Sequence, residues 1–255
     1  LQTQFIDREL ESITAYYIDA LPVVHEKQLE YDIQKLKDGQ PVQYVCGVSF
    51  FYGYKFQINP SVLIPRPETE ELVYWLESDL KGNTIEQSVL DIGSGSGNIL
   101  LSLMMKIPLL NGTALDVSSA ALEVVKQNAQ QFQLSPQLIA MDILNTKQII
   151  TLPKYDIIVS NPPYILGSEK DRMGKDVLQH EPHNALFVDG QDPLIFYKAI
   201  LNLADDHINE NGKLYFETSD LYHQELEYAV QNTKAKSYEF RKDLQGKWRM
   251  LKLNF

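Results

Sequence analysis

The apolar positions of this chain follow two alternating patterns, short continuous runs and longer stretches with helical spacing. Buried strands give short runs, whereas a helix that buries one face repeats its apolar residues every three to four positions. Strands that alternate with helices are typical of a parallel sheet covered by helices. The pattern predicts strands at 88–92, 112–116, 138–141, 155–159 and 213–217, and helices at 98–106, 121–132 and 192–208.

The C-terminal part of the chain predicts a hairpin. Residues 238–241 and 247–253 have the composition of strands, and the segment between them carries Asp243 and Gly246, which are typical turn residues. Two strands joined by a tight turn run antiparallel. We therefore expect an α/β fold with a seven-stranded, mostly parallel sheet whose last strand is antiparallel.

The N-terminal part has a different character. Residues 1–45 are predicted to be helical, because apolar residues recur at helical spacing. Residues 41–47 break this pattern, and the aromatic residues and glycine of 50–58 predict a short hairpin. We therefore expect a helical domain at 1–45, a β-hairpin connector at 46–61 and a large α/β domain at 62–255. The chain begins with Leu1 instead of methionine, and the completeness of the helical domain is left open.

Composition narrows the class of protein. The chain has 255 residues, 44% of them hydrophobic and 22% charged, which is ordinary for a globular protein. Its apolar runs are too short to cross a bilayer, its start lacks the pattern of a signal peptide, and it has one cysteine, Cys46. We therefore expect a cytoplasmic protein without a membrane partner. The net charge of −11 is poorly suited to binding a phosphate backbone.

A glycine-rich loop follows the first predicted strand. Its sequence is Asp91-Ile92-Gly93-Ser94-Gly95-Ser96-Gly97, and a predicted helix comes directly after it. A strand, a glycine loop and a helix hold nucleotide-like ligands close to backbone amides. The spacing differs from the G-x-G-x-x-G of dinucleotide sites, which disfavours a nicotinamide dehydrogenase. Because Asp91 repels phosphate and suits a cation, the loop favours a ligand such as S-adenosylmethionine.

Acidic residues end the next two strands. Asp116, at the end of the second strand, is placed to accept hydrogen bonds from two ribose hydroxyls. The alternative is that it caps the following helix, although Ser118 or Ser119 can do this instead. Asp142 and Ile143 end the third strand and are candidates to contact the amino group and one ring face of an adenine. The alternative is that they form a polar strand end beside a surface loop.

The fourth strand ends abruptly in Asn161-Pro162-Pro163-Tyr164. Proline cannot continue a strand, so the chain turns outward at the sheet edge where α/β proteins bind ligands. The rigid loop presents an amide, a carbonyl and an aromatic face. These groups suit a flat substrate that donates hydrogen bonds, such as a carboxamide or a nucleobase NH₂. The competing interpretation is a proline-capped turn after a core strand.

Three further features are weaker. Arg66 lies between two prolines before a predicted helix and is a weak candidate for substrate binding. His180 and His183 are loop residues rather than metal ligands, because Pro182 separates them and no cysteine lies nearby, so we expect no metal site. Residues 167–174 are polar and flanked by glycine, which suits either a flap over the substrate or an exposed loop.

These motifs together resemble a known family. The glycine loop with Asp116 and Asn161–Tyr164 resembles class I S-adenosylmethionine-dependent amino-group methyltransferases. The segments 41–47, 62–71 (with Ile-Pro-Arg-Pro-Glu-Thr-Glu) and 181–187 are similar to the HemK/PrmC family. The resemblance covers nearly the whole chain from about residue 40 onward. It departs from the family in its short N-terminal helical part and in Ile143, where some members carry an aromatic residue.

The resemblance implies a function and a set of roles. Members of this family transfer a methyl group from S-adenosylmethionine to the glutamine of the Gly-Gly-Gln loop of peptide chain release factors, leaving S-adenosylhomocysteine. Release factors are thus the expected partners of a monomeric enzyme without sequence-specific nucleic-acid binding. The expected catalytic residues are Asn161, Pro162 and Tyr164, with Pro163 and Arg66 at the substrate. Expected at the cofactor are Asp91, Gly93, Ser94, Gly95, Ser96, Gly97, Asp116, Asp142, Ile143 and Asn161.

Two other functions remain open at this stage. An adenine-N6 nucleic-acid methyltransferase shares the Asn-Pro-Pro-Tyr loop, but it needs a basic groove that this acidic chain does not suggest. A cofactor-binding interaction module without catalysis is disfavoured by the intact loop.

Overall fold

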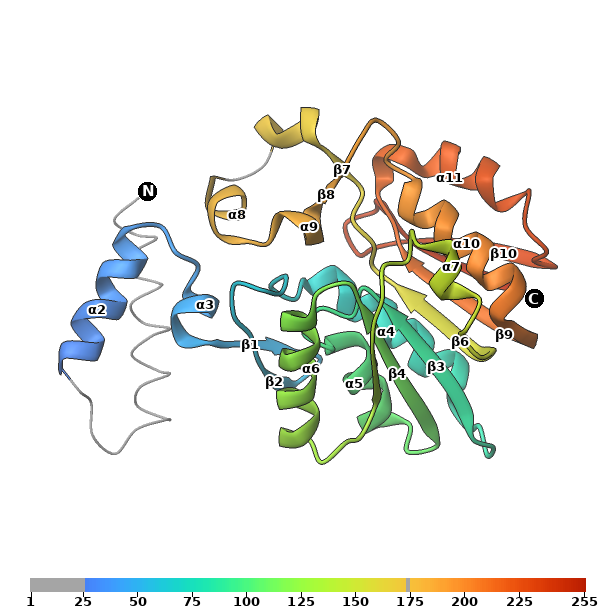
Figure 1. Ribbon diagram of the computed structural model, residues 1–255, viewed down its shortest axis with the longest axis horizontal. Helices are drawn as coiled ribbons and strands as arrows, with labels where there is room; N and C mark the ends of the chain where they lie inside the picture. The colour runs from blue at the N-terminus through green and yellow to red at the C-terminus, as the bar shows by residue number, and fades with distance from the viewer. Residues whose placement is uncertain (1–25, 173–174) are drawn as a thin grey trace.

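The computed structural model describes residues 26–172 and 175–255, and its centre is a twisted sheet with helices packed on both faces (Figure 1). The sheet has seven strands in the order β10-β11-β9-β6-β3-β4-β5. These are β3 (Gln87–Ile92), β4 (Leu110–Asp116), β5 (Gln137–Ala140), β6 (Tyr155–Ser160), β9 (Ile208–Glu217), β10 (Ser237–Lys242) and β11 (Trp248–Asn254).

The strand directions confirm the predicted sheet. Parallel pairing joins β5 to β4, β4 to β3, β3 to β6 and β6 to β9. The last strand, β11, pairs antiparallel with both β9 and β10. The chain moves outward from β3 to β5 and then returns to the other side of β3 with β6. The carboxyl ends of β3 and β6 therefore flank the switch point at which α/β sheets bind ligands.

Two hydrophobic clusters cover the two faces of the sheet. Alternate residues of a strand point to opposite faces, so Val89 belongs to one cluster and Leu90 to the other. The first cluster packs against α4 (Pro67–Leu80), α5 (Asn98–Lys106) and α6 (Ser119–Gln131). The second packs against α10 (Ile195–His207) and α11 (His223–Val230).

Local sequence explains where these helices begin. Pro67 occupies the first turn of α4, where its missing N–H costs nothing, and Glu68 and Glu70 lie at the positive end of the helix dipole. Ser118 caps α6 by accepting a hydrogen bond from the Ala121 amide at 3.2 Å. The sequence predicted that either Ser118 or Ser119 would do this. Gly97 precedes α5 with φ of 76°, and a Cβ there would lie 3.1 Å from side-chain atoms of Leu101 and Val125.

The connector before the main domain agrees with the prediction in part. The hairpin is present as β1 (Val48–Phe51) and β2 (Tyr54–Gln57), joined antiparallel. The helical prediction for 1–45 is borne out where it can be seen, in α2 (Glu26–Lys37), while residues 1–25 lie outside the described residues. The expectation that 41–47 breaks the helical pattern is correct only in part: residues 38–41 are not helical, but α3 (Val42–Cys46) occupies most of 41–47. Pro41 precedes α3, and Gly47 ends it with φ of 69°.

Other boundaries differ from the prediction. The helix expected from residue 192 begins at Ile195, because Pro193 and the Asp192 side chain, which accepts from the Leu194 amide at 3.0 Å, form a turn first. Strand β9 begins at Ile208 instead of residue 213. Short elements that the pattern did not predict are α7 (Thr146–Ile149), β7 (Ile165–Leu166), η1 (Gly167–Arg172), α8 (Lys175–His180), α9 (His183–Leu186), β8 (Phe187–Val188), η2 (Asp220–Tyr222) and α11.

Candidate functional site

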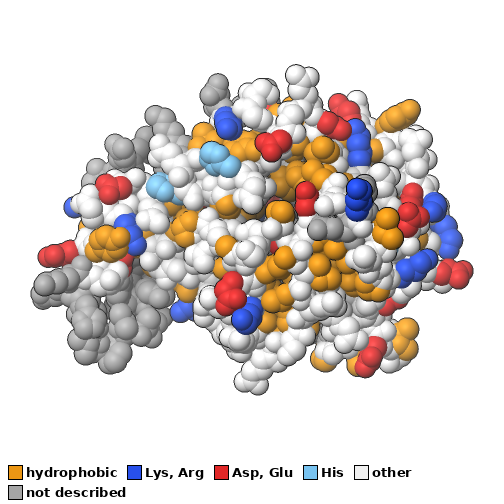
Figure 2. All heavy atoms as spheres, in the orientation of Figure 1, with side chains coloured by type: hydrophobic (Ala, Val, Ile, Leu, Met, Phe, Trp, Pro, Cys, Tyr) orange, Lys and Arg blue, Asp and Glu red, His pale blue; other side chains and the backbone are white. Residues whose placement is uncertain are grey.

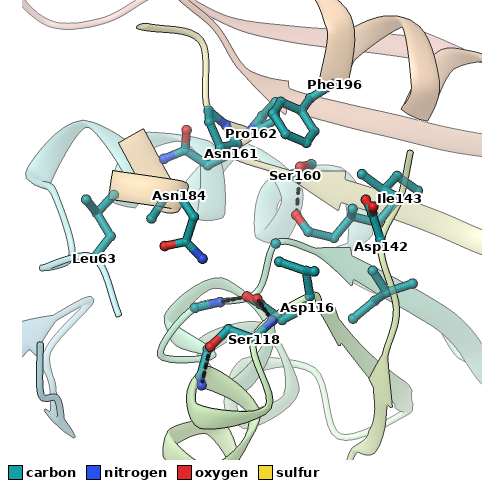
Figure 3. Close-up of a pocket in the computed structure, with 18 of the residues that line it drawn as sticks. Leu63, Asp116, Ser118, Asp142, Ile143, Ser160, Asn161, Pro162, Asn184 and Phe196 are labelled. Carbon is teal, nitrogen blue, oxygen red and sulfur yellow. Dashed lines mark hydrogen bonds between the residues drawn. The ribbon is translucent and has the colours of Figure 1, made fainter. Parts of the chain in front are cut away.

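One cavity lies over the carboxyl ends of four neighbouring strands (Figure 3). Residues from β3, β4, β5 and β6 and the loops after them form its floor and sides, as the sequence predicts. Two segments distant in sequence, 61–63 and 184–185, close it on one side (Figure 3). Its lining includes Leu63, Gly93, Gly95, Asp116, Ser118, Asp142, Ile143, Ser160, Asn161, Pro162, Pro163, Asn184, Phe196 and Ile200.

The glycine loop forms one side of the cavity with its backbone. Gly93 and Gly95 line the cavity and adopt positive φ angles of 72° and 53°, which residues with a Cβ rarely take. The Gly93 amide donates to the Leu115 carbonyl at 2.8 Å, which ties the loop to β4. The predicted ligands Ser94, Ser96 and Gly97 are not part of the lining. Both serines are buried, although they belong to the loop, and the Gly97 amide donates to the Ser94 carbonyl.

Asp91 is also behind the loop rather than in the cavity lining. Its side chain is buried, and neither carboxylate oxygen has a hydrogen-bond partner within the described part of the chain. Burial raises the pKa of Asp91 to about 7, and the nearby Asp116 charge adds to this, while the Leu100 amide at the start of α5 opposes it. A buried carboxylate beside a cavity, with no ion pair among the described residues, is an electrostatic reason for a cation to bind there.

Asp116 is one of two acidic residues in the cavity lining, and Asp142 is the other. Its two oxygens accept hydrogen bonds from the Ser118 amide at 2.9 Å and the Gly95 amide at 3.0 Å, which fix the orientation of the carboxylate (Figure 3). Burial raises the pKa of Asp116, and these amides act against that shift. Each oxygen keeps a second lone pair, so the group can accept from two hydroxyls of a ligand.

The far end of the cavity is an apolar slot. Ile143 is buried after β5, and Phe196 and Ile200 of α10 also line the cavity. Asp142, beside Ile143, orients its carboxylate by accepting from the Leu144 amide at 2.9 Å. Sequence patterning predicted Asp142 and Ile143 but missed Phe196 and Ile200, because a helix stripe does not reveal which of its residues will face a cavity.

The loop after β6 reaches the same cavity from the other side. Asn161, Pro162 and Pro163 are in the lining, and Ser160 anchors the strand end by donating to the Ile92 carbonyl at 2.7 Å. Tyr164 is not in the lining. It packs against the second hydrophobic cluster, where burial and the Glu217 charge raise its pKa.

Arg66 has a structural partner in this structure. Its guanidinium forms an ion pair of 2.5 Å with Glu181, whose other carboxylate oxygen accepts from the Ile64 amide at 3.2 Å. Arg66 does not line the cavity. It joins the segment before α4 to the segment that leads into α9, and these are the two segments that close the cavity.

The remaining sequence features do not add a second chemical centre. His183 is held by the Leu178 carbonyl at 2.9 Å, and residues 26–172 and 175–255 contain no group of three or more His, Cys, Asp or Glu side chains suited to a metal ion. Residues 167–172 of the expected flap form η1, and Glu169 there accepts from the Tyr222 hydroxyl at 2.8 Å, while 173–174 lie outside the described residues. Over the part of the chain that the structure describes, no helix has the length and apolarity needed to cross a membrane.

Known proteins share both the sequence and the fold. The family model for the methyltransferase small domain matches residues 69–201. The release factor glutamine methyltransferase of Flavobacterium psychrophilum is 40% identical over 230 residues, which cover 89% of this chain and 80% of that protein. The protein of the same name from Bacteroides thetaiotaomicron is 38% identical over 234 residues, covering 92% and 83%.

A solved structure shows the same architecture. A 16S ribosomal RNA methyltransferase of T. thermophilus, in complex with AdoMet and guanosine, matches with a TM-score of 0.59. The identity is 19%, over 81% of this chain and 49% of that chain, so this likeness concerns the fold alone.

Proposed function

This chain belongs to the family of release factor glutamine methyltransferases, and on this premise we propose that it methylates the side-chain amide nitrogen (N5) of the glutamine in the Gly-Gly-Gln motif of peptide chain release factors. S-adenosylmethionine is the methyl donor. The observation that carries the proposal is that Asn161 and Pro162 line the same cavity as Gly93, Gly95 and Asp116. A hydrogen-bonding loop for an amide substrate and a site for a nucleoside are thereby adjacent.

The residues of the cavity fit the cofactor. Asp116 is oriented to accept the ribose hydroxyls, and the slot of Ile143 and Phe196 suits an adenine ring, with Asp142 at its edge. Gly93 and Gly95 let the backbone approach the ligand. The buried Asp91 carboxylate provides negative charge for a cation. Ser94, Ser96 and Gly97 are proposed to shape the loop from behind.

The bound cofactor supplies an electrophilic methyl group on a positively charged sulfur. A carboxamide nitrogen is a weak nucleophile because its lone pair is delocalised into the carbonyl. We assign to the Asn161 side-chain oxygen and the Pro162 carbonyl the role of accepting the two N–H bonds of the substrate amide. These contacts align the nitrogen and stabilise the positive charge that develops on it. The proton leaves after attack, so no strong base is needed.

Pro163 keeps the loop rigid, and Tyr164 is proposed to contact the substrate amide from outside the cofactor cavity. The structure gives Arg66 a partner in Glu181, so a direct contact with substrate is the weakest of these assignments. The division into a helical domain at 1–45, a connector at 46–61 and a methyltransferase domain at 62–255 is likewise a proposal, as is a monomeric state.

An adenine-N6 nucleic-acid methyltransferase is the second candidate, because it uses the same loop. On the face shown in Figure 2, the blue Lys and Arg side chains of the described residues are interspersed with red Asp and Glu and form no continuous basic groove. Together with the net charge of −11, this favours a protein substrate over a nucleic acid. The oriented Asp116 and Asn161 in one cavity also argue against a binding module without catalysis.

The test is a transfer assay with radiolabelled S-adenosylmethionine. Purified release factor, the same factor with its Gly-Gly-Gln glutamine replaced, and duplex or structured nucleic acid are offered in parallel. We expect label on the unmodified release factor only. Label that persists after replacement of the glutamine, or label on nucleic acid alone, would overturn the proposal.

A further inference from the structure

Two buried polar side chains lie directly behind Asn161. Thr69, in the first turn of α4, is 3% exposed, and Glu217, at the carboxyl end of β9, is 4% exposed. The Thr69 hydroxyl lies 2.5 Å from a Glu217 carboxylate oxygen, and the Asn161 side-chain nitrogen lies 3.5 Å from the same hydroxyl. Three residues from separate parts of the fold thus form a series of hydrogen bonds, Glu217 to Thr69 to Asn161, that ends at the cavity.

The number of available protons determines which group donates and which accepts in each of these hydrogen bonds. When Glu217 is ionised, its carboxylate only accepts hydrogen bonds, so Thr69 donates its single proton to Glu217. The hydroxyl oxygen then has only lone pairs left to offer Asn161. It therefore selects the NH₂ end of the Asn161 amide, and the carbonyl end of that amide is left to accept from a ligand.

The orientation of the Asn161 amide matters for the proposed function. A substrate carboxamide NH₂ needs an acceptor, and an Asn161 side chain turned by 180° would present a donor to a donor. The two orientations have nearly the same shape, so packing alone distinguishes them poorly. A polar contact on the buried side is what makes one orientation favourable.

We propose that Thr69 and Glu217 are positioning residues that hold the Asn161 side chain with its nitrogen inward and its oxygen toward the substrate amide. This inference rests on the proposed function, because it assigns a role to groups behind the substrate-binding loop. Neither residue lines the cavity, so neither is expected to touch cofactor.

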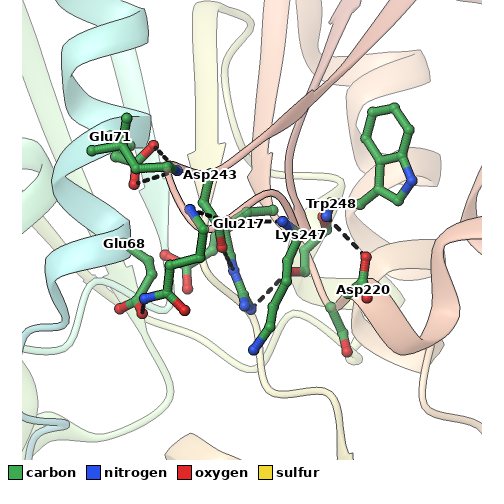
Figure 4. Close-up of polar contacts among 12 residues, drawn as sticks. Glu68, Glu71, Glu217, Asp220, Asp243, Lys247 and Trp248 are labelled. Atoms are coloured by element: carbon green, nitrogen blue, oxygen red, sulfur yellow. Dashed lines mark hydrogen bonds and ion pairs between the residues drawn. The ribbon is translucent and has the colours of Figure 1, made fainter.

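The surroundings hold Glu217 in place. Its backbone carbonyl accepts from the Tyr197 hydroxyl at 3.0 Å, and the Arg249 charge nearby favours its ionised form. Arg249 is itself fixed by Asp243 at 3.2 Å in the C-terminal hairpin turn, which lies beside Glu217 (Figure 4). Arg66 and Glu68 are the other charged groups that act on Glu217. Burial raises its pKa to about 7, so assays belong at about pH 8.5, where the carboxylate is ionised.

A purely structural role is the competing explanation, since the contact between Thr69 and Glu217 also joins α4 to β9. The two roles make different predictions for conservative variants. A structural contact affects stability and cofactor binding together with turnover. A positioning contact affects turnover and the Asn161 side chain, with cofactor binding unchanged.

The experiment compares Thr69→Val, which removes the hydroxyl but keeps the shape, with Thr69→Ser, which keeps the hydroxyl. Thr218→Val is the matched control, because Thr218 is the next residue after Glu217, is 1% exposed, and its hydroxyl has no hydrogen-bond partner among the described residues. Each variant is measured for kcat and KM on release factor, for cofactor Kd, and for the NMR signals of the Asn161 side-chain NH₂, assigned with Asn161→Asp.

We expect Thr69→Val to lower kcat roughly 10- to 100-fold and to speed hydrogen exchange of the Asn161 NH₂, with cofactor Kd within about threefold of the parent. Thr69→Ser and Thr218→Val should behave like the parent. Unchanged kcat or unchanged NH₂ exchange in Thr69→Val would overturn the inference, as would equal impairment of Thr69→Val and Thr69→Ser. The NMR readout does not depend on the substrate, so it separates failure of this inference from failure of the proposed function.

Discussion

At the scale of single residues, the site contains two kinds of group. Some side chains face the cavity, and others lie behind its walls and influence the ligand without touching it. Asn161 and Asp116 face the cavity, whereas Asp91 is buried behind the glycine loop. The first two can form hydrogen bonds with ligands directly. Asp91 acts on the ligand through its charge, since it lies outside the cavity lining.

Replacing Asn161 by alanine tests the direct role. We expect Asn161→Ala to lower kcat by roughly 100-fold or more, because the substrate amide loses an oriented acceptor, while cofactor affinity stays within a few fold. The labelled transfer assay and calorimetric titration of the cofactor measure the two effects. The exposed Asn111, at the start of β4, provides a control as Asn111→Ala. Equal loss of turnover and cofactor binding would contradict the assigned role.

Replacing Asp91 by asparagine tests the charge. Burial raises the pKa of Asp91 to about 7, so the folded protein holds a proton on this carboxyl up to about that pH, whereas the unfolded chain releases it near the ordinary aspartate pKa of 3.8. Between these values the unfolded state binds fewer protons, so stability falls as pH rises. We expect the difference in free energy of unfolding between about pH 5 and pH 8 to shrink by roughly 2 to 3 kcal/mol in Asp91→Asn.

Glu217 titrates in the same range and is present in both proteins, so part of the pH dependence should remain. Urea unfolding of the cofactor-free protein at several pH values gives the comparison. The same variant should bind S-adenosylmethionine more weakly. An unchanged pH profile would show that Asp91 is ionised in the folded protein at low pH.

At the scale of elements, two connections join segments that are distant in sequence. The ion pair between Arg66 and Glu181 joins the segments that close the cavity. On another side, the C-terminal hairpin turn is fastened to the start of α4, where the Leu244 amide donates to both oxygens of Glu71 at 3.2 Å (Figure 4). The first connection involves segments beside the cavity, and the second fixes the start of α4, which carries Thr69.

Breaking the first connection should loosen the cover of the cavity. Arg66→Met leaves the buried Glu181 carboxylate without its cation, which we expect to destabilise the protein by roughly 1 to 3 kcal/mol. We also expect faster amide hydrogen exchange in α9 and weaker cofactor binding. Glu181→Gln completes a double-mutant cycle, and additive effects of the two substitutions would show that the pair is not coupled.

At the scale of the whole molecule, the cofactor cavity spans four strands and several loops. A ligand that binds only the folded state stabilises all of these elements together. We expect S-adenosylmethionine at about 100 times its Kd to add about 2.7 kcal/mol to the free energy of unfolding. The measurement is the midpoint of thermal unfolding against cofactor concentration. Asp116→Ala should reduce this shift at the same concentrations, and an undiminished shift would place the ribose contact elsewhere.

The sequence alone determined the order of strands and helices in the main domain and the loops that carry the chemistry. Strands β3, β4, β5 and β6 are apolar runs with clear ends, so the positions of Asp116, Asp142 and Asn161 follow from local pattern. The helix start at Pro67 and the cap at Ser118 are equally local. Local signals failed where short elements depend on packing, as in α3, α8, α9 and α11.

Tertiary structure decided which residues surround these loops. Phe196 of α10 and Asn184 of α9 line the cavity, and Thr69 and Glu217 meet behind Asn161 although 148 positions separate them in the chain. No local pattern carries such information, because it depends on how the sheet orders its strands. The same holds for Asp91, Ser94, Ser96 and Tyr164, whose sequence motifs predicted contact with ligand and whose side chains lie outside the cavity lining. A motif places a residue near a site, and packing of the surrounding elements decides which way its side chain faces.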